Sequence, residues 1–142
     1  GGWIYHRCLP LCIISPSSVL VHQAVLDQEG VFDEELPVCE DYELWLRIAC
    51  RHPILFLQNP LIIKVGGHPD QLSHSMWGMD RYRVKALLKI ASSGHLTPLQ
   101  EAWTAHEIAR KAAILATGFG KRQKWDEAEK YGRLTEEYKH KV

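Results

Sequence analysis

The sequence changes character once along its length, and this change limits the folds that the chain can adopt. Residues 1–70 contain β-branched, proline-interrupted stretches, and four basic against nine acidic side chains give them a formal charge of −5. The remaining residues are rich in alanine, lysine and glutamate at helical spacing, and thirteen basic against eight acidic side chains give them +5. Such a joint shift predicts two structural parts. We place the junction at residues 73–77 and expect domains at 1–75 and 76–142.

The composition of the whole chain excludes some classes of function. The 142 residues carry 17 basic and 17 acidic side chains, so bulk positive charge cannot drive nucleic-acid binding. No apolar run approaches the roughly 18 residues of a membrane-spanning helix, and no signal peptide is visible. We therefore expect a cytoplasmic chain with no transmembrane segment and no nucleic-acid partner. A peripheral contact at a membrane surface is an alternative.

The four cysteines are irregularly spaced and have apolar neighbours, which favours reduced, buried thiols. They are Cys8, Cys12, Cys39 and Cys50. A zinc cluster is the alternative, although its spacing has no paired knuckle to complete it. Its ligands would be His6, Cys8, Cys12 and His22.

Short apolar runs and turn residues predict a mixed α/β structure in the first part. A helix over 41–51 is predicted because Leu44 and Ile48 lie on one stripe, and Pro53 ends it. The other expected elements are strands over 11–15, 18–21, 54–57 and 61–65 and a helical turn over 24–28.

In the second part, the helical spacing of the residues predicts three helices, over 77–92, 97–118 and 121–140. The middle helix has the clearest start, with Thr97 as N-cap, Pro98 at the first helical position and Gln100 completing a capping box. Its many alanines allow a neighbouring helix to approach closely. We expect an antiparallel helical hairpin.

Two polar groups are candidates for chemistry. Glu40 and Asp41 open the helix over 41–51, where they could cap free backbone N–H groups and stabilise the helix by roughly 1 kcal/mol. Alternatively, one of these carboxylates takes a proton from a substrate hydroxyl. The loop over 66–73 follows an apolar strand, and its His68 or Asp70 could reach a divalent metal or a phosphate. An exposed turn is the alternative for this histidine.

The order of these motifs resembles the C-terminal half of family 2 glycosyltransferases with the GT-A fold. The series consists of residues 15–19 (SPSSV), 30–34 (GVFDE), 40–47 (EDYELWLR), 60–61 (PL) and 68–73 (HPDQLS). The resemblance implies an α/β fold, a partial GT-A-like unit of short strands with helices. An all-α helical hairpin extension would follow it.

The resemblance also implies an activity and the residues that perform it. A sugar would pass from a nucleotide-sugar donor to a hydroxyl of a glycan or another acceptor, with inversion and with Mn²⁺ or Mg²⁺ as cofactor. Asp41 would be the catalytic base, Glu40 would orient it, and His68 would contact the metal, with His74 in reserve. The implied substrate-binding residues are Ser17, Ser18, Asp33 and Lys64.

The chain departs from the family pattern in two places. Gly66 and Gly67 stand where the family usually has a cationic residue, and the nucleotide-binding half with its Asp-x-Asp motif has no counterpart. We therefore expect a fragment that is inactive or nearly so alone and binds metal only together with the missing half. The alternative is a noncatalytic protein-interaction module. Its C-terminal helices resemble a tetratricopeptide-type hairpin and would bind a protein partner from a degenerate transferase scaffold.

Overall fold

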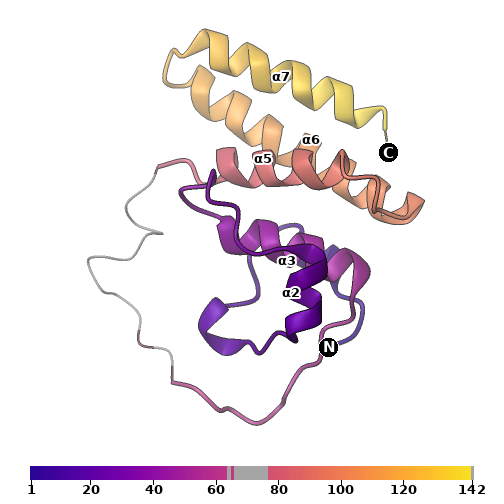
Figure 1. The fold of residues 1–142 in the computed structure, drawn as a ribbon. Helices are drawn as coiled ribbons and strands as arrows, with labels where there is room; N and C mark the ends of the chain where they lie inside the picture. Colours follow the sequence, from indigo (N-terminus) through magenta and orange to yellow (C-terminus); the bar gives the residue numbers. More distant parts are fainter. Residues whose placement is uncertain (64, 66–76, 142) are drawn as a thin grey trace. The chain divides into compact units, whose positions relative to one another are not determined.

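A computed structural model describes residues 1–63, 65 and 77–141 of the chain, and most of these residues are helical (Figure 1). The elements are α1 (Tyr5–Cys8), the 3₁₀ helix η1 (Pro16–Ser18), α2 (Gln23–Glu29), α3 (Glu40–Arg51), α5 (Asp80–Ala91), α6 (Pro98–Gly120) and α7 (Trp125–Lys139). The chain divides into two compact units, Gly1–Met79 and Asp80–Val142. None of the described helices combines the length and the apolar composition that a bilayer span requires.

The expected α/β, GT-A-like fold is wrong. The structure is 59% helix and 2% strand, and the described residues form no sheet. Residues 54–57 and 61–63 lack a partner strand, and the one pairing described is an antiparallel bridge between Gly2 and Ile54. The reason is physical: apolar runs predict a segment that gains by burial, but a strand also needs a neighbour to take up its backbone hydrogen bonds.

Helix α3 is the centre of the first unit, and both α1 and α2 contact it. Its side chains Leu44, Trp45 and Ile48 form an apolar cluster, as the predicted stripe requires. Parts of residues 12–25 pack against this cluster, together with Ile54. The predicted helix is thus confirmed, and it begins one residue earlier than expected.

The short helix α2 ends where a glycine permits an unusual backbone conformation. Gly30 has a φ of 81°, and its N–H donates to the carbonyl of Leu26 over 2.8 Å. A substituted residue would be strained there. Gly30 therefore fixes the point at which the chain leaves α2. The loop that follows, residues 31–39, contains Asp33, Glu34 and Glu35 and is called the acidic loop below.

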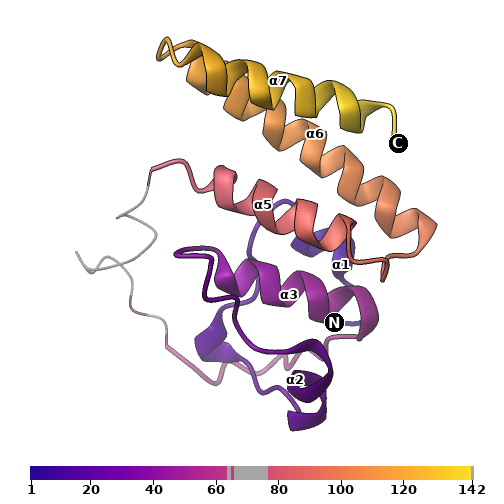
Figure 2. The ribbon, with the colours of Figure 1, turned by 45° about the horizontal axis from the view of Figure 1, so that its top comes forward.

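The second unit consists of three helices, and α6 packs against both α5 and α7 (Figure 2). The predicted capping box is present, because the Thr97 side chain accepts from the Gln100 N–H while the Gln100 side chain accepts from the Thr97 N–H. The expected hairpin of α6 and α7 is confirmed. Its contact includes the stacked rings of Phe119 and Tyr131, whose centroids lie 5.6 Å apart.

A buried cation also holds the second unit together. The ammonium of Lys111 lies 3.1 Å from an Asp80 carboxylate oxygen and 3.3 Å from a Glu107 oxygen, and its side chain is only 2% exposed. Asp80 also accepts from Arg83 over 3.0 Å. Because a buried charge is costly unless it is paired, these contacts join the start of α5 to the middle of α6.

Candidate functional site

Asp41 lies in the first turn of α3 and is partly buried, with both carboxylate oxygens engaged. Its Oδ1 accepts the backbone N–H of Tyr42 over 2.7 Å. Its Oδ2 accepts the S–H of Cys12 over 3.3 Å. The positive end of the helix dipole further favours a negative charge at this position. Asp41 is therefore a carboxylate held in a fixed orientation rather than a freely rotating surface acid.

The thiol of Cys12 serves as a hydrogen-bond donor because it stays protonated. Burial raises its pKa to about 12, and the neighbouring charge of Asp41 adds to the shift. The same sulfur lies 3.4 Å from the carbonyl oxygen of Ile14. Sequence reasoning considered Cys12 as a buried thiol or a zinc ligand and missed this contact, which joins residues 29 positions apart.

The residue just before the acidic pair has an uncommon backbone conformation. Cys39 is the N-cap of α3 with a φ of 64°, in the left-handed region, and its side chain makes no capping hydrogen bond. Its sulfur lies 3.8 Å from the carbonyl oxygen of Met79. Asp41 takes over part of the capping role by accepting the Tyr42 N–H, as the capping interpretation predicts. Capping and a chemical role for Asp41 are compatible.

A buried ion pair fixes the chain segment that leads into the acidic loop. The Glu43 side chain is 2% exposed and accepts from Arg47 Nε over 2.8 Å and from Nη2 over 2.7 Å. Arg47 also donates to the carbonyls of Glu29 and Val31, the latter over 2.7 Å. Sequence reasoning missed this brace. The i, i+4 spacing of a glutamate and an arginine on one helix was the available signal.

A second buried acid joins the end of α2 to the end of α3. The Glu29 side chain is 3% exposed, and its Oε1 lies 3.2 Å from Arg51 Nη1 and 2.9 Å from His52 Nε2. Together with the Arg47 brace, this contact holds the end of α2 and the start of the acidic loop against α3.

The remaining predicted residues have other surroundings. Glu40 is the first residue of α3 and is partly exposed. Ser17 and Ser18 are exposed in η1, where Ser18 Oγ donates to the Ser15 carbonyl over 2.8 Å. Asp33 Oδ1 accepts the Glu35 N–H over 3.0 Å, which closes a turn. The hydrogen bonds described for Ser18 and Asp33 are local to their own loops.

The predicted metal ligand lies outside the described residues. This holds for His68 and its reserve His74, and also for Lys64. The expected pairing of Asp41 with a metal-binding histidine therefore stays a prediction.

Among the residues that the structure describes, no group of three or more His, Cys, Asp or Glu side chains is placed to hold a metal ion. The alternative zinc cluster of Cys8, Cys12 and two histidines is therefore not formed, and none of the four cysteines is in a disulfide within the described structure. For the same reason, the residues of 1–63, 65 and 77–141 do not by themselves fit the Mn²⁺ or Mg²⁺ that the family resemblance implies. We derive no step of the chemistry through a metal.

Trp45 leaves a buried polar atom beside the candidate base. It lies one helical turn after Asp41, and Cys12, which contacts Asp41, also packs against the cluster that contains Trp45. Its Nε1 is buried and has no hydrogen-bond partner within the described structure. An unsatisfied buried donor costs free energy, so a hydrogen-bond acceptor that reached the Trp45 Nε1 would be favoured there.

Comparison of the chain with models of protein families, with curated proteins and with solved structures gave no match.

Proposed function

We propose that this chain is the acceptor-side part of an inverting family 2 glycosyltransferase, with Asp41 as the base. The observation that carries the proposal is the oriented, partly exposed carboxylate of Asp41 at the start of α3. The ordered motif series in residues 15–73 supports the family. The proposal predicts a nucleotide-sugar donor and a hydroxyl acceptor, without nucleic acid, in the cytoplasm.

The proposed chemistry is a single displacement. The acceptor hydroxyl donates a hydrogen bond to the Asp41 carboxylate and loses its proton to it as the oxygen attacks the anomeric carbon. The bond from that carbon to the diphosphate oxygen breaks, the leaving oxygen keeps the electron pair, and the configuration inverts. Each carboxylate oxygen can accept more than one hydrogen bond, so the contacts with Tyr42 and Cys12 leave room for the hydroxyl.

Only part of the chemistry is assigned to this chain. Asp41 and Glu40 would form the base and its neighbour, and Ser17, Ser18 and Asp33 would bind substrate. The nucleotide sugar and the divalent cation would be held by a nucleotide-binding half.

The experiment that tests this proposal measures transfer. The chain is joined to a family 2 nucleotide-binding half and incubated with Mn²⁺ and a panel of UDP-glucose, UDP-N-acetylglucosamine and GDP-mannose. Release of nucleoside diphosphate should depend on an added saccharide acceptor. Release that is absent, or that does not respond to the acceptor, would contradict the proposal.

A noncatalytic interaction module is the second candidate function. It is favoured by the α6–α7 hairpin, whose two helices pack closely against each other around the stacked rings of Phe119 and Tyr131. Titration calorimetry separates the two candidates. Coupled binding of Mn²⁺ and a nucleotide sugar by the joined protein supports the transferase, whereas a pure interaction module shows no such coupling.

A further inference from the structure

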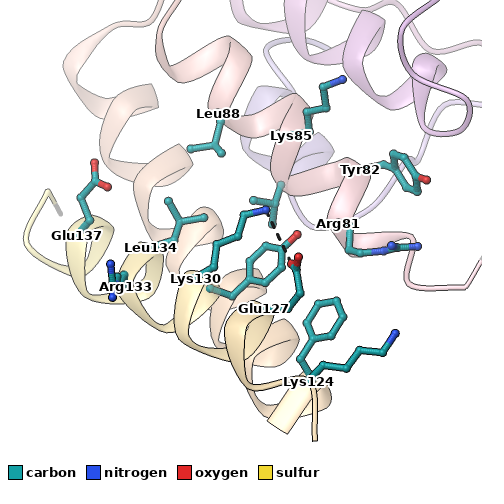
Figure 3. A pocket seen from close by; sticks show the side chains of 13 residues that line it. Arg81, Tyr82, Lys85, Leu88, Lys124, Glu127, Lys130, Arg133, Leu134 and Glu137 are labelled. Atoms are coloured by element: carbon teal, nitrogen blue, oxygen red, sulfur yellow. Dashed lines mark ion pairs between the residues drawn. The ribbon is translucent and has the colours of Figure 1, made fainter. Parts of the chain in front are cut away.

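The second unit contains an open groove between α5 and α7, with a volume of about 680 Å³ (Figure 3). Both helices contact α6, and Phe119 near the end of α6 contributes to the lining. All of the lining residues belong to the second unit. The groove is therefore a property of this three-helix unit alone.

The floor of the groove is apolar. Val84, Phe119 and Tyr131 line it and belong to the buried core cluster of the unit. Leu88 from α5 and Leu134 from α7 also line it and are only partly buried. Since their apolar surface is not fully covered, burying it under a ligand would be favourable.

The rim of the groove is basic. Five cationic side chains line it, against two acidic ones, Glu127 and Glu137. The cations are Arg81, Lys85, Lys124, Lys130 and Arg133. Some of these side chains already form ion pairs: Lys130 with Glu127 over 3.8 Å, Glu137 with Lys141 over 2.7 Å, and Arg133 with Glu129, and all of them are substantially exposed. Because exposed pairs of this kind contribute little, they can exchange for contacts with an acidic ligand.

We propose that this groove binds an amphipathic helix of a partner protein, with an apolar stripe flanked by acidic residues. The apolar floor would receive side chains at i, i+3, i+4 and i+7 of that helix, and the basic rim would pair with its acids. The lining residues on this side extend from Lys124, the N-cap of α7, to Glu137, which corresponds to about 20 Å of helix and to a partner segment of about 14 residues.

The shape of the groove favours this occupant over a lipid surface. A flat membrane offers no element to fill the space between α5 and α7, whereas a helix can lie along it and contact Leu88 and Leu134. The inference goes beyond the transferase proposal and does not depend on Asp41. It deepens the second candidate function and rests on it, because it gives the interaction module a defined surface.

The test uses the full chain and a fluorescein-labelled peptide of about 14 residues with leucines at i, i+3, i+4 and i+7 and glutamates elsewhere. Two controls accompany it: a peptide with the same residues in scrambled order and one with lysine in place of each glutamate. Fluorescence anisotropy should show that the chain binds the acidic amphipathic peptide at least about tenfold more tightly than either control. Equal binding of all three peptides would overturn the inference.

Variants then locate the binding. Lys85→Glu combined with Lys130→Glu reverses the charge on both walls and should weaken peptide binding about tenfold or more. Lys139→Glu changes an α7 lysine outside the lining and should stay within about twofold. Circular dichroism checks that the variants fold. If the double glutamate variant does not fold, Lys85→Gln with Lys130→Gln replaces it and should weaken binding by a smaller factor.

Phosphatidylcholine vesicles that contain phosphatidylserine test the alternative, in which the groove contacts a membrane surface. Binding to these vesicles without binding to the acidic peptide would overturn the inference in favour of a membrane surface. Neither result bears on acceptor-dependent transfer. A chain that does not bind the acidic peptide would not contradict the transferase proposal, and a joined protein that does not transfer sugar would not contradict peptide binding in the groove.

Discussion

The second unit has a buried apolar cluster to which all three of its helices contribute, whereas the first unit leaves an extended apolar segment uncovered. In α6, Ile108 and Ala112 are 0% exposed, but Leu55 is 91% exposed and Ile63 is 94% exposed. Three helices can cover one another by local packing, whereas in segment 54–63 the described contacts are at Ile54, which forms the bridge with Gly2 and packs against the α3 cluster. Helices α5, α6 and α7 thus supply the apolar side chains that form the core of their unit, whereas the packing of the first unit is centred on α3.

The largest expected difference between the two units is in the free energy of unfolding that is lost when a leucine is truncated to alanine. Leu115→Ala removes a side chain from the core cluster of the second unit and should cost about 2–5 kcal/mol in the free energy of unfolding. Leu55→Ala changes an exposed side chain and should stay within about 0.5 kcal/mol. Urea denaturation followed by circular dichroism measures both. Equal losses would show that Leu55 is covered in solution.

Acid should weaken the second unit through Asp80. Burial opposes ionisation of Asp80, but hydrogen bonds from Arg83 and Lys111 outweigh it and hold its pKa below the ordinary value of 3.8. The folded state thus binds the proton less readily than the unfolded one. The stabilisation is present above the unfolded pKa and is lost as pH falls through the folded pKa.

Asp80→Asn should remove this pH dependence and destabilise α5 and α6 by about 2 kcal/mol, because the buried ammonium of Lys111 loses a charged hydrogen-bond partner. Hydrogen exchange of the α6 amides measures the loss. Asp27→Asn is the control in the first unit, on the exposed face of α2, and should change little. Unchanged exchange in Asp80→Asn would contradict the role of the buried cation.

In the first unit, Arg47→Lys should loosen the entry to the acidic loop. Lysine keeps the charge but cannot reproduce the two hydrogen bonds to Glu43 together with those to two backbone carbonyls. We expect a loss of about 1–2 kcal/mol and faster hydrogen exchange at residues 29–33. Arg7→Lys, at an exposed position on α1, is the matched control. Exchange that is equally slow in both variants would exclude the brace.

The smallest expected effect concerns thiol reactivity. A pKa of about 12 leaves very little Cys12 thiolate near neutral pH, so iodoacetamide should label folded Cys12 far more slowly than the urea-unfolded chain. Peptide mass spectrometry reads the labelling at each cysteine. Burial also raises the pKa values of Cys8 and Cys50, to about 11, and these thiols should be slow as well. Rapid labelling of folded Cys12 would mean that its thiol does not donate to Asp41.

Local rules predicted the helices well. The start of α6 follows from Thr97 and Gln100, because a capping box involves only neighbouring residues. The start of α7 was placed too early because Gln123 adopts a φ of 57°, and no nearby residue predicts this left-handed turn. The strand over 54–57 was wrong because the pattern of apolar residues cannot say whether a partner strand is present.

The candidate site was only partly predictable for the same reason. The motif containing Asp41 predicted an acid at a helix start, which the structure confirms. The contact with Cys12 and the brace from Arg47 to the chain after α2 join residues far apart in the sequence. Such contacts follow from tertiary packing, which spacing along the chain does not encode.

The central claim is that Asp41 is the base, and the most direct test compares transfer rates of Asp41→Asn and wild type in the joined protein. Asparagine keeps the size of the side chain but cannot take a proton, so the account predicts a loss of about 10²–10⁴-fold in kcat. Glu34→Gln, at an exposed acid of the loop before α3, should keep nearly the full rate. A folded Asp41→Asn protein that transfers sugar at the wild-type rate would contradict the account.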